Sequence, residues 1–559
     1  MIARLLFALL FVRAIVFSPV YSSPVKQKNE KPPRIVNIVN FIRELEPRDP
    51  KITKEVLYQT VVSQIKLFSQ YHLPATYLLQ YDALVDPKYQ KLLKARIAAG
   101  DEVGAWWEIT QPHVEAAGLH WRGRYPWDWH ANVGFSTGYT PKERELLVDT
   151  YMKKFKEIFG TYPSTVASWF IDAHSLEYMY NKYHIVASAN CKDQIGTDGY
   201  TLWGGYWNQA YYPSKVNAYM PAQTKEEQIG VPVFRMLGSD PIYQYTSGMG
   251  SAAQGVITLE PVYGHAGADR RWVNWFLQSL TDEPCLAFAY TQAGQENSFT
   301  WDAMKGGLEM QAPIFDSLRN AGKITVETMV ATGKWFKKNF TLTPATAVTA
   351  TKDYKAEGHK TAWYNSRFYR ANLLWTNDSF SIRDIHLFDE RLQSTYLDKP
   401  GTSTQCIYET LPVVDGHNWS SNDILAGLRI VQLLPGGGEK EVACKNIAVT
   451  VMAGKDLEAT WQTPAGDKFT IQFFEDYFAV TCRPTGHDFK WALELQASAE
   501  AALPFTNITP GKIEASQSGF AYKITCVQGQ VEKAAAARSY IFRVLPTNQK
   551  IVINCNTQM

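Results

Sequence analysis

The feature that most constrains this fold is an alternation of strand and helix patterns from residue 35 to residue 340. Short apolar runs predict buried strands, and longer amphipathic stretches between them predict helices. Strands that alternate with helices predict a parallel sheet, and about seven such units predict a (β/α) barrel. The predicted strands are 35–42, 75–81, 102–109, 165–172, 185–191, 231–237, 285–292 and 323–329, and the predicted helices are 54–71, 87–99, 141–159, 173–182 and 301–320.

A second region begins after a proline-containing break near Thr341–Pro344. Strand patterns dominate beyond this break, and turn residues separate them. The predicted strands include 469–475, 477–482, 490–496, 540–546 and 550–555. The predicted fold is therefore α/β, with a seven-stranded barrel over 33–340 followed by an antiparallel β-sandwich over 345–559. The second domain is expected to cover the barrel or shape a cleft wall, with carbohydrate binding as the alternative.

The N-terminus has the pattern of a secretory signal peptide. A short basic start precedes an apolar run and small residues near Ser22 and Ser23, so 1–22 are predicted to be removed on export. Arg13 interrupts the apolar run, and we expect no membrane span after signal cleavage. The predicted location is secreted or periplasmic. Disulfides are permitted there, but the odd count of seven cysteines leaves at least one outside any intramolecular pair.

Charge and aromatic content bear on the predicted partner. The 56 basic and 54 acidic side chains nearly cancel, which gives no reason to expect nucleic acid or an anionic membrane. Aromatic residues make up 13% of the chain, and flat rings suit the C–H faces of sugars. An oligo- or polysaccharide is therefore a predicted partner, although a large aromatic core explains the composition equally well.

Residues 72–113 resemble the second and third strand units of NodB-type polysaccharide deacetylases. In that family a glycine-led strand precedes a His-x-x-x-His pair, and Gly100–Gly104 match the lead. The wider glycoside hydrolase/deacetylase superfamily also contains glycosidases with seven-stranded (β/α) barrels, whose order of elements is similar to that of 33–340. More narrowly, the chain looks similar to a two-domain group from gut Bacteroidetes that combines such a barrel with a C-terminal β domain.

The metal ligands that the resemblance implies are absent. The two histidines fall on Trp106 and Thr110, and the Asp-Asp pair of the first strand falls near Asn40 and Phe41. Metal-dependent hydrolysis needs about three protein ligands and an open position. We therefore expect no metal and no cofactor, and a chemistry that rests on carboxylates.

Carboxylates after the predicted strands supply catalytic candidates. Active sites of α/β barrels lie at the C-terminal strand ends, and glycoside hydrolysis needs an acid and a second carboxylate. In the resembling glycosidases these groups follow strands four and seven, which implies by position Asp172 as nucleophile and Glu296 as acid. Glu108 is the third candidate. Asp172 could instead cap the following helix, and Glu296 could form a salt bridge.

Other residues near the same strand ends are predicted to contact substrate. They are Arg43, Trp106, Trp107, His113, His174, Asp193, Arg235, Asp240, Gln292 and Trp301. Structural roles compete with this interpretation, since Asp193 and Arg235 could pair with each other and Asp240 could shape a turn. Two aromatic loops, 120–130 and 196–212, are predicted to form cleft walls, or else pack on each other.

The favoured function is an exported, metal-independent glycoside hydrolase that uses two carboxylates at barrel strand ends. One alternative is a carbohydrate deacetylase with an atypical metal site built from His113, His174 or Asp193. The other is a non-catalytic glycan-binding protein that has kept the barrel. Carboxyl groups about 5–5.5 Å apart would indicate a retaining glycosidase, and about 6.5–9.5 Å an inverting one.

Overall fold

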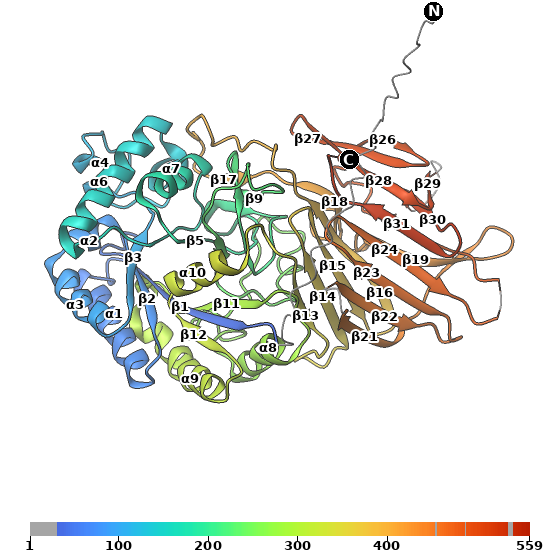
Figure 1. The fold of residues 1–559 in the computed structure, drawn as a ribbon, viewed down its shortest axis with the longest axis horizontal. Helices are drawn as coiled ribbons and strands as arrows, with labels where there is room; N and C mark the ends of the chain where they lie inside the picture. Colours follow the sequence, from blue (N-terminus) through green and yellow to red (C-terminus); the bar gives the residue numbers. More distant parts are fainter. Residues whose placement is uncertain (1–30, 453–455, 487, 535–539, 559) are drawn as a thin grey trace, which may run out of the picture.

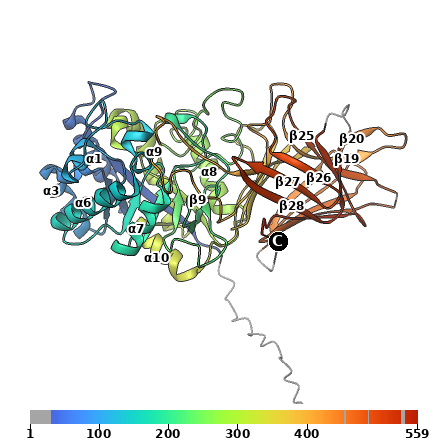
Figure 2. The ribbon, with the colours of Figure 1, turned by 90° about the horizontal axis from the view of Figure 1, so that it is seen from above.

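The computed structural model describes residues 31–452, 456–486, 488–534 and 540–558. A helix-rich N-terminal lobe and a strand-rich C-terminal lobe lie side by side (Figure 1 and Figure 2). The predicted signal peptide falls outside the described residues. No helix within these ranges is long and apolar enough to cross a membrane.

A nearly closed sheet of parallel strands forms the centre of the N-terminal lobe, which confirms the predicted barrel. Neighbouring strands, in order, are β11 (Ala289–Ala293), β1 (Arg34–Ile42), β2 (Ala75–Leu79), β3 (Glu102–Trp106), β4 (Thr165–Ala167), β5 (Ala187–Asn190) and β10 (Val233–Arg235). Each of these pairs is parallel. β12 (Thr325–Glu327) pairs with the first half of β1, while β2 pairs with its second half.

The gap between β10 and β11 is bridged by Gln209 rather than by a strand pair. Its carbonyl accepts the Arg235 amide at 2.9 Å, and its side-chain amide exchanges hydrogen bonds with the backbone of Tyr290 at 3.0 and 3.2 Å. β7 (Ala210–Tyr211) then pairs with β10 in the antiparallel sense. The Gln209 side-chain amide therefore closes the barrel by making the pair of hydrogen bonds that a strand backbone would otherwise make.

Helices cover the outside of this sheet (Figure 1). They are α1 (Lys54–Gln70), α2 (Tyr81–Val85), α3 (Pro87–Ala98), α4 (Gln111–Ala116), α5 (Ala131–Gly134), α6 (Pro141–Phe159), α7 (Ala173–Tyr183), α8 (Arg270–Asp282), α9 (Thr300–Asn320) and α10 (Met329–Asn339), with short 3-10 turns at Ser136–Gly138, Thr197–Gly199 and Asn297–Phe299. Thr140 caps α6 through a capping box with Glu143, as its position before the helix predicts.

The C-terminal lobe is an antiparallel sandwich, as its strand-rich sequence predicts. One sheet contains β13 (Thr346–Ala350), β14 (His359–Asn365), β15 (Tyr369–Thr376), β16 (Ser379–Leu387), β18 (Leu411–Asp415), β19 (Gly427–Leu433), β20 (Glu439–Glu441), β25 (Trp491–Gln496), β29 (Gln530–Lys533) and β30 (Phe542–Leu545). The other contains β21 (Lys445–Val451), β22 (Leu457–Gln462), β23 (Lys468–Phe473), β24 (Tyr477–Arg483), β26 (Phe505–Thr509), β27 (Lys512–Gln517), β28 (Phe520–Gln528) and β31 (Lys550–Asn554). Burial alternates along strands such as β23, because one face of each sheet meets the core.

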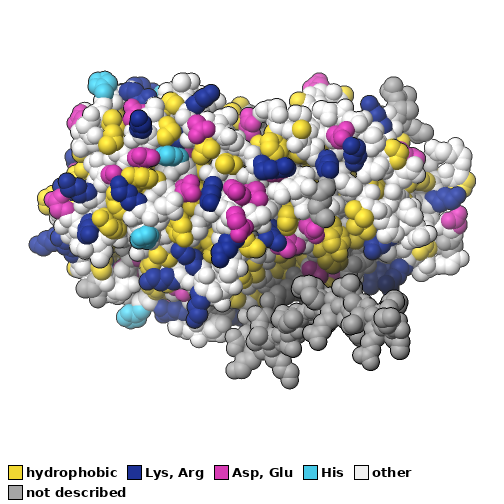
Figure 3. Space-filling view, turned by 45° about the horizontal axis from the view of Figure 1, so that its top comes forward, with side chains coloured by type: hydrophobic (Ala, Val, Ile, Leu, Met, Phe, Trp, Pro, Cys, Tyr) yellow, Lys and Arg dark blue, Asp and Glu magenta, His cyan; other side chains and the backbone are white. Residues whose placement is uncertain are grey.

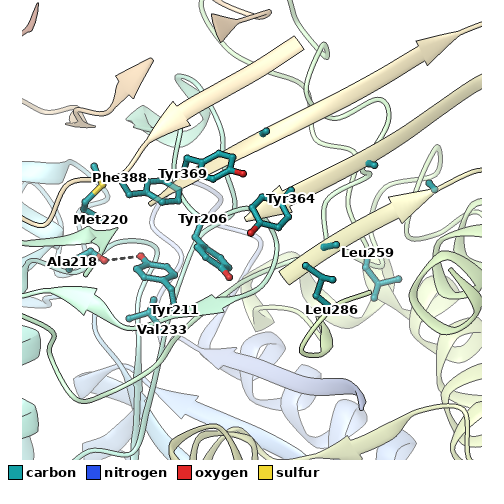
Figure 4. Close-up of a cluster of buried hydrophobic side chains, with 14 of the residues drawn as sticks. Tyr206, Tyr211, Ala218, Met220, Val233, Leu259, Leu286, Tyr364, Tyr369 and Phe388 are labelled. Carbon is teal, nitrogen blue, oxygen red and sulfur yellow. Dashed lines mark hydrogen bonds between the residues drawn. The ribbon is translucent and has the colours of Figure 1, made fainter. Parts of the chain in front are cut away.

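The two lobes share a core. Tyr206 and Tyr211 of the barrel lobe lie near Tyr364 and Tyr369 of the sandwich (Figure 4), and Trp207 stacks on Trp363 with ring centroids 3.8 Å apart.

Small strands add to the same junction. β17 (Cys406–Tyr408) leaves the sandwich and pairs with β6 (Tyr200–Leu202), while β8 (Pro213–Ser214) and β9 (Asn217–Pro221) form a hairpin. The sandwich is therefore held against the barrel and contributes backbone to its loops.

Charges of both signs are interspersed on the face in Figure 3, without a broad area of one sign. This distribution agrees with the nearly balanced composition, which gives no reason to expect a polyanionic partner.

Candidate functional site

A cavity of about 640 Å³ opens at the C-terminal ends of the barrel strands. Its lining includes residues that follow six different strands: Arg43, Glu108, Trp169, Lys192, Leu237 and Glu296. Active sites of α/β barrels occupy this end because the loops that follow the strands converge there. The cavity is therefore the candidate functional site.

Aromatic loops form the cavity walls. Trp127, Trp129 and His130 line it from the first aromatic loop, and residues 197–200 line it from the second. Tyr263 and Phe299 add further rings. Thr404 and Gln405, just before β17, bring the sandwich lobe to the rim, so that both lobes shape the opening. The rest of the second aromatic loop contributes to the lobe junction instead, where Trp203 and Trp207 are buried.

Two of the positions that the resemblance assigns to metal ligands, Phe41 and Trp106, hold packed aromatic rings. Phe41 stacks on Trp106 with centroids 4.0 Å apart, and Trp169 meets both rings edge-on. Among the described residues, the one group of three ligands within reach of a single ion is Asp353, Glu357 and His359, in the sandwich lobe outside the cavity lining. The residues present in the cavity thus do not fit the metal site of the deacetylases.

Arg43 joins two carboxylates of the cavity. Its guanidinium donates to Glu108 at 2.6 and 2.9 Å and lies 2.8 Å from Glu296. The same group stacks over Trp127, 4.2 Å from the ring centroid. Glu108 has a side chain that is 0% exposed and also accepts from Gln80, so its oxygens are committed to protein donors. Glu108 consequently fixes Arg43, and Arg43 fixes Glu296.

Glu296 and Glu260 are linked through one glutamine. Gln295 donates through Nε2 to the Glu260 carboxyl group at 3.0 Å, and its Oε1 accepts a hydrogen bond from the backbone amide of Glu296 at 2.8 Å. Glu260 also accepts from Thr258, and Glu296 accepts from Ser298, both at 2.7 Å. Burial raises the pKa of both carboxyl groups above the ordinary value, although these donors oppose the shift. The cavity therefore presents two buried carboxyl groups in different settings, one ion-paired to Arg43 and the other held by neutral donors.

Backbone strain is concentrated near the same cavity. Leu237 and Asp198 line it with φ angles of +74° and +56°, and Thr300, which follows the lining residue Phe299, has a φ of +66°. A β-branched residue at positive φ is unusual and costs on the order of 1–3 kcal/mol. Such strain persists only where surrounding contacts over-determine the conformation, and it clusters at functional sites.

Of the residues predicted from the sequence, Arg43, Glu108 and Glu296 line the cavity. Asp172 does not. It is the N-cap of α7, accepting the Ser175 amide at 2.8 Å, and it pairs with Arg144 at 2.9 Å. Its side chain is 0% exposed, so the alternative of a structural cap replaces the catalytic role.

The predicted histidine contacts are also structural. His113 is buried, donates from Nε2 to the Leu147 carbonyl at 2.8 Å and stacks on Tyr81. Burial lowers the pKa of His113 to about 4, so this ring is neutral near pH 7. His174 lies on the surface of α7 and contacts Glu145 at 3.1 Å.

The remaining predicted residues lie outside the cavity lining. Asp193 pairs with Arg235 and with Arg370 of the sandwich, so it belongs to the lobe junction. Asp240 accepts two backbone amides at 2.8 Å and the Trp272 indole at 2.7 Å, as expected of a turn residue. Four others pack in the barrel wall or at the start of a helix and do not line the cavity: Trp106, Trp107, Gln292 and Trp301.

Sequence reasoning missed Lys192 and Glu260. Lys192 is adjacent to Asp193, a predicted contact residue, and follows the predicted strand 185–191. Glu260 lies in an irregular loop after β10, where no periodic pattern marks an inward position. The missed Trp127, Trp129 and His130 belong to an aromatic loop that was recognised only as a whole.

Comparison with known proteins identifies the fold. No protein-family model matches the sequence, and no curated protein is detectably similar to it. A crystal structure from Parabacteroides distasonis, provisionally described as a glycoside hydrolase/deacetylase, matches with a TM-score of 0.53 and 16% identity, covering 69% of this chain and 89% of that chain.

Two polysaccharide deacetylases, also provisionally described, match less well. One from Mycobacterium smegmatis has a TM-score of 0.35 and 10% identity, covering 57% of this chain and 94% of its own. One from Pseudomonas aeruginosa has a TM-score of 0.36 and 13% identity, covering 56% and 93%. At these identities the first likeness shows fold alone: the chain has a fold in common with a glycoside hydrolase/deacetylase structure, as the sequence resemblance predicted.

Proposed function

We propose that this protein is an exported, metal-independent glycoside hydrolase whose catalytic carboxyl groups are Glu260 and Glu296. The observation that carries the proposal is that these two buried carboxyl groups line one cavity walled by aromatic rings, where Gln295 bonds the Glu260 carboxyl and the backbone amide of Glu296. Hydrolysis of a glycosidic bond needs one carboxylic acid to protonate the leaving oxygen and a second carboxylate that acts as nucleophile or as base for a water. Aromatic walls offer stacking faces for sugar rings.

The surroundings of the two carboxyl groups support distinct roles. Glu296 lies 2.8 Å from the Arg43 guanidinium, which favours its ionised form, so it is assigned as nucleophile or base. Glu260 has no guanidinium contact among the described residues and is held by an amide and a hydroxyl, so it is assigned as acid. This reverses the acid role that the resemblance implies for Glu296 and replaces Asp172 by Glu260.

Glu108 is assigned a positioning role. It binds Arg43 through two hydrogen bonds, and the third guanidinium nitrogen lies 2.8 Å from a Glu296 oxygen and donates to Ser298 at 3.3 Å. Such preorganised charge stabilises developing charge without reorganisation during the reaction.

The test is sugar release by the wild type and by Glu260→Gln and Glu296→Gln, across aryl glycosides and plant and host polysaccharides. Loss of a general acid or base lowers the rate by about 10²–10⁴-fold. We expect losses of that size in both variants with unchanged circular dichroism. Exposed Glu309 on α9 provides the matched control, and Glu309→Gln should retain full activity.

A second arm assigns the roles. Aryl glycosides with good leaving groups do not need protonation, so Glu260→Gln should retain much of its activity on them while Glu296→Gln should not. Full activity of both variants would falsify the assignment. Metal-dependent acetate release without sugar release would identify the deacetylase alternative, and glycan binding without turnover would identify the binding protein.

A further inference from the structure

Lys192 is a buried lysine without a carboxylate partner. It is 1% exposed and lines the cavity after β5. Among the described residues, its ammonium makes one hydrogen bond, to the Asp193 carbonyl at 3.4 Å, and has no carboxylate oxygen within 4.0 Å. An ammonium has three protons to donate, and burying it without a counter-charge is expensive.

Buried arginines of the described chain have a carboxylate partner or several acceptors. Arg43, Arg144 and Arg235 each have a carboxylate within 2.9 Å. Arg370 is held between Asp193 and Asp384. Arg383 has no carboxylate but donates to Asn372 and to the carbonyls of Pro241 and Ile242. Lys192 differs because it is both short of acceptors and open to a cavity.

The acidic groups nearest to Lys192 are engaged elsewhere. Asp193 is neutralised by Arg235 and Arg370, and Asp198 is exposed to solvent. Glu260 accepts from Gln295 and Thr258, and in the proposed reaction it carries a proton. The Cys191 thiol is neutral because burial raises its pKa to about 12. The protein therefore supplies no ion pair for Lys192, while the cavity leaves room for a ligand that does.

We infer that Lys192 binds an anionic group of the sugar substrate, a uronate carboxylate or a sulfate ester. The inference deepens the proposed function by naming its substrate class, and it rests on that function for the claim that the ligand is a sugar. A carboxylate or sulfate provides several acceptor lone pairs, which would satisfy the remaining ammonium protons in a charge-assisted manner. A neutral sugar would leave the buried charge uncompensated.

Binding of an anion next to Lys192 should be coupled to proton uptake, which can be measured. Burial lowers the pKa of Lys192 in the free protein. A bound anion favours the ammonium and raises that pKa, so binding at a pH between the two values takes up a proton. The measured binding enthalpy at alkaline pH should then depend on the ionisation enthalpy of the buffer. The titratable groups that face Lys192 are Cys191, Asp193, Asp198 and Glu260, and the Glu260→Gln background removes the cavity carboxyl group whose pKa is itself raised by burial.

The experiment is calorimetric binding of glucuronate, glucose 6-sulfate and glucose to the wild type, Lys192→Met and Lys192→Arg. We expect at least one anionic sugar to bind the wild type about tenfold or more tightly than glucose, which corresponds to about 1.4 kcal/mol. Lys192→Met should lose this preference and the proton uptake, whereas Lys192→Arg should keep the preference. Lys305→Met, on the exposed face of α9, is the control that should bind like the wild type.

The outcomes distinguish a uronate from a sulfated substrate, and they distinguish failure of the Lys192 inference from failure of the proposed hydrolase. A preference for glucuronate identifies a uronate substrate, and a preference for the 6-sulfate identifies a sulfated one. Equal binding of glucose, no binding of either anionic sugar, or an unchanged preference in Lys192→Met overturns the inference. Borohydride trapping of a reducing sugar on Lys192 also overturns it, because the amine would then form an imine. Lys192-dependent anion binding without any sugar release refutes the proposed hydrolase alone, whereas equal hydrolysis of an anionic glycan by wild type and Lys192→Met refutes the inference alone.

Discussion

Replacing Arg43 by methionine tests whether the cavity is built on a buried ion-pair cluster. Arg43 is 3% exposed and makes contacts of 2.6, 2.9 and 2.8 Å with Glu108 and Glu296. Without the guanidinium, the fully buried Glu108 carboxylate keeps only the Gln80 amide as a donor. Removing one partner of a buried pair costs about 3–5 kcal/mol, because the other charge is left uncompensated. The folding equilibrium constant should therefore fall by roughly two to four orders of magnitude.

Urea unfolding followed by tryptophan fluorescence measures this loss, since Trp127 lies directly against Arg43. Lys54→Met is the matched control, because Lys54 pairs with Glu44 near the same strand end but is 62% exposed. Exposed pairs contribute about 0–1 kcal/mol.

A double-mutant cycle then isolates the ion pair. Arg43→Met/Glu108→Gln should be more stable than the sum of the single changes by at least about 1 kcal/mol, since the stranded charge is gone. A loss below about 1 kcal/mol in Arg43→Met, or additivity within about 0.5 kcal/mol, would refute the reasoning.

Three further predictions concern groups that the structure places outside catalysis. Asp172→Ala should lose about 3–5 kcal/mol of stability through the broken Arg144 pair and lost helix cap, while ligand affinity of the refolded cavity stays unchanged by calorimetry. Because the His113 pKa falls from 6.5 to about 4 on folding, the unfolded chain binds the extra proton. Stability should therefore be full above about pH 6.5 and fall by about 1.4 kcal/mol per unit toward pH 4, and urea titrations should show a flatter dependence in His113→Leu. All seven cysteines are unpaired and buried, and burial raises the Cys191 and Cys444 pKa values to about 12, so a thiol-reactive dye should label the native protein only after denaturant is added.

The barrel could be predicted because its signals are local and periodic. The sequence predicts a strand at 35–42, and β1 spans Arg34–Ile42; it predicts a helix at 141–159, and α6 spans Pro141–Phe159. Strand ends were less predictable. The apolar run 165–172 predicts a long strand, but β4 ends at Ala167, since the following residues remain buried while leaving the sheet. Burial by loops and burial by a sheet give the same apolar run.

The catalytic candidates were harder to predict because inward and outward positions differ by one residue. Side chains at a strand end alternate between faces, so a single step exchanges a residue of the cavity for one of the outer wall. Lys192 lines the cavity, while its neighbour Asp193 turns to Arg235 and Arg370 at the lobe junction. A sequence shows that both are polar, but not that a domain 177 residues further along supplies Arg370. The prediction that Asp193 contacts substrate is therefore replaced by a tertiary contact at the lobe junction.

Asp172 is a second case in which the sequence position alone does not determine the role of a strand-end carboxylate. An aspartate directly after a barrel strand satisfies the rule for a catalytic position, and an aspartate directly before a helix satisfies the rule for an N-cap. The role of the Asp172 carboxylate follows from its four donors: the amide and the hydroxyl of Ser175 in its own helix, the Ser136 hydroxyl and the Arg144 guanidinium. Once four donors surround both oxygens, no lone pair is left for a substrate or a reacting water. Counting the donors around each strand-end carboxylate thus separates structural acids such as Asp172 and Glu108 from Glu260 and Glu296, which is a criterion that only the folded chain provides.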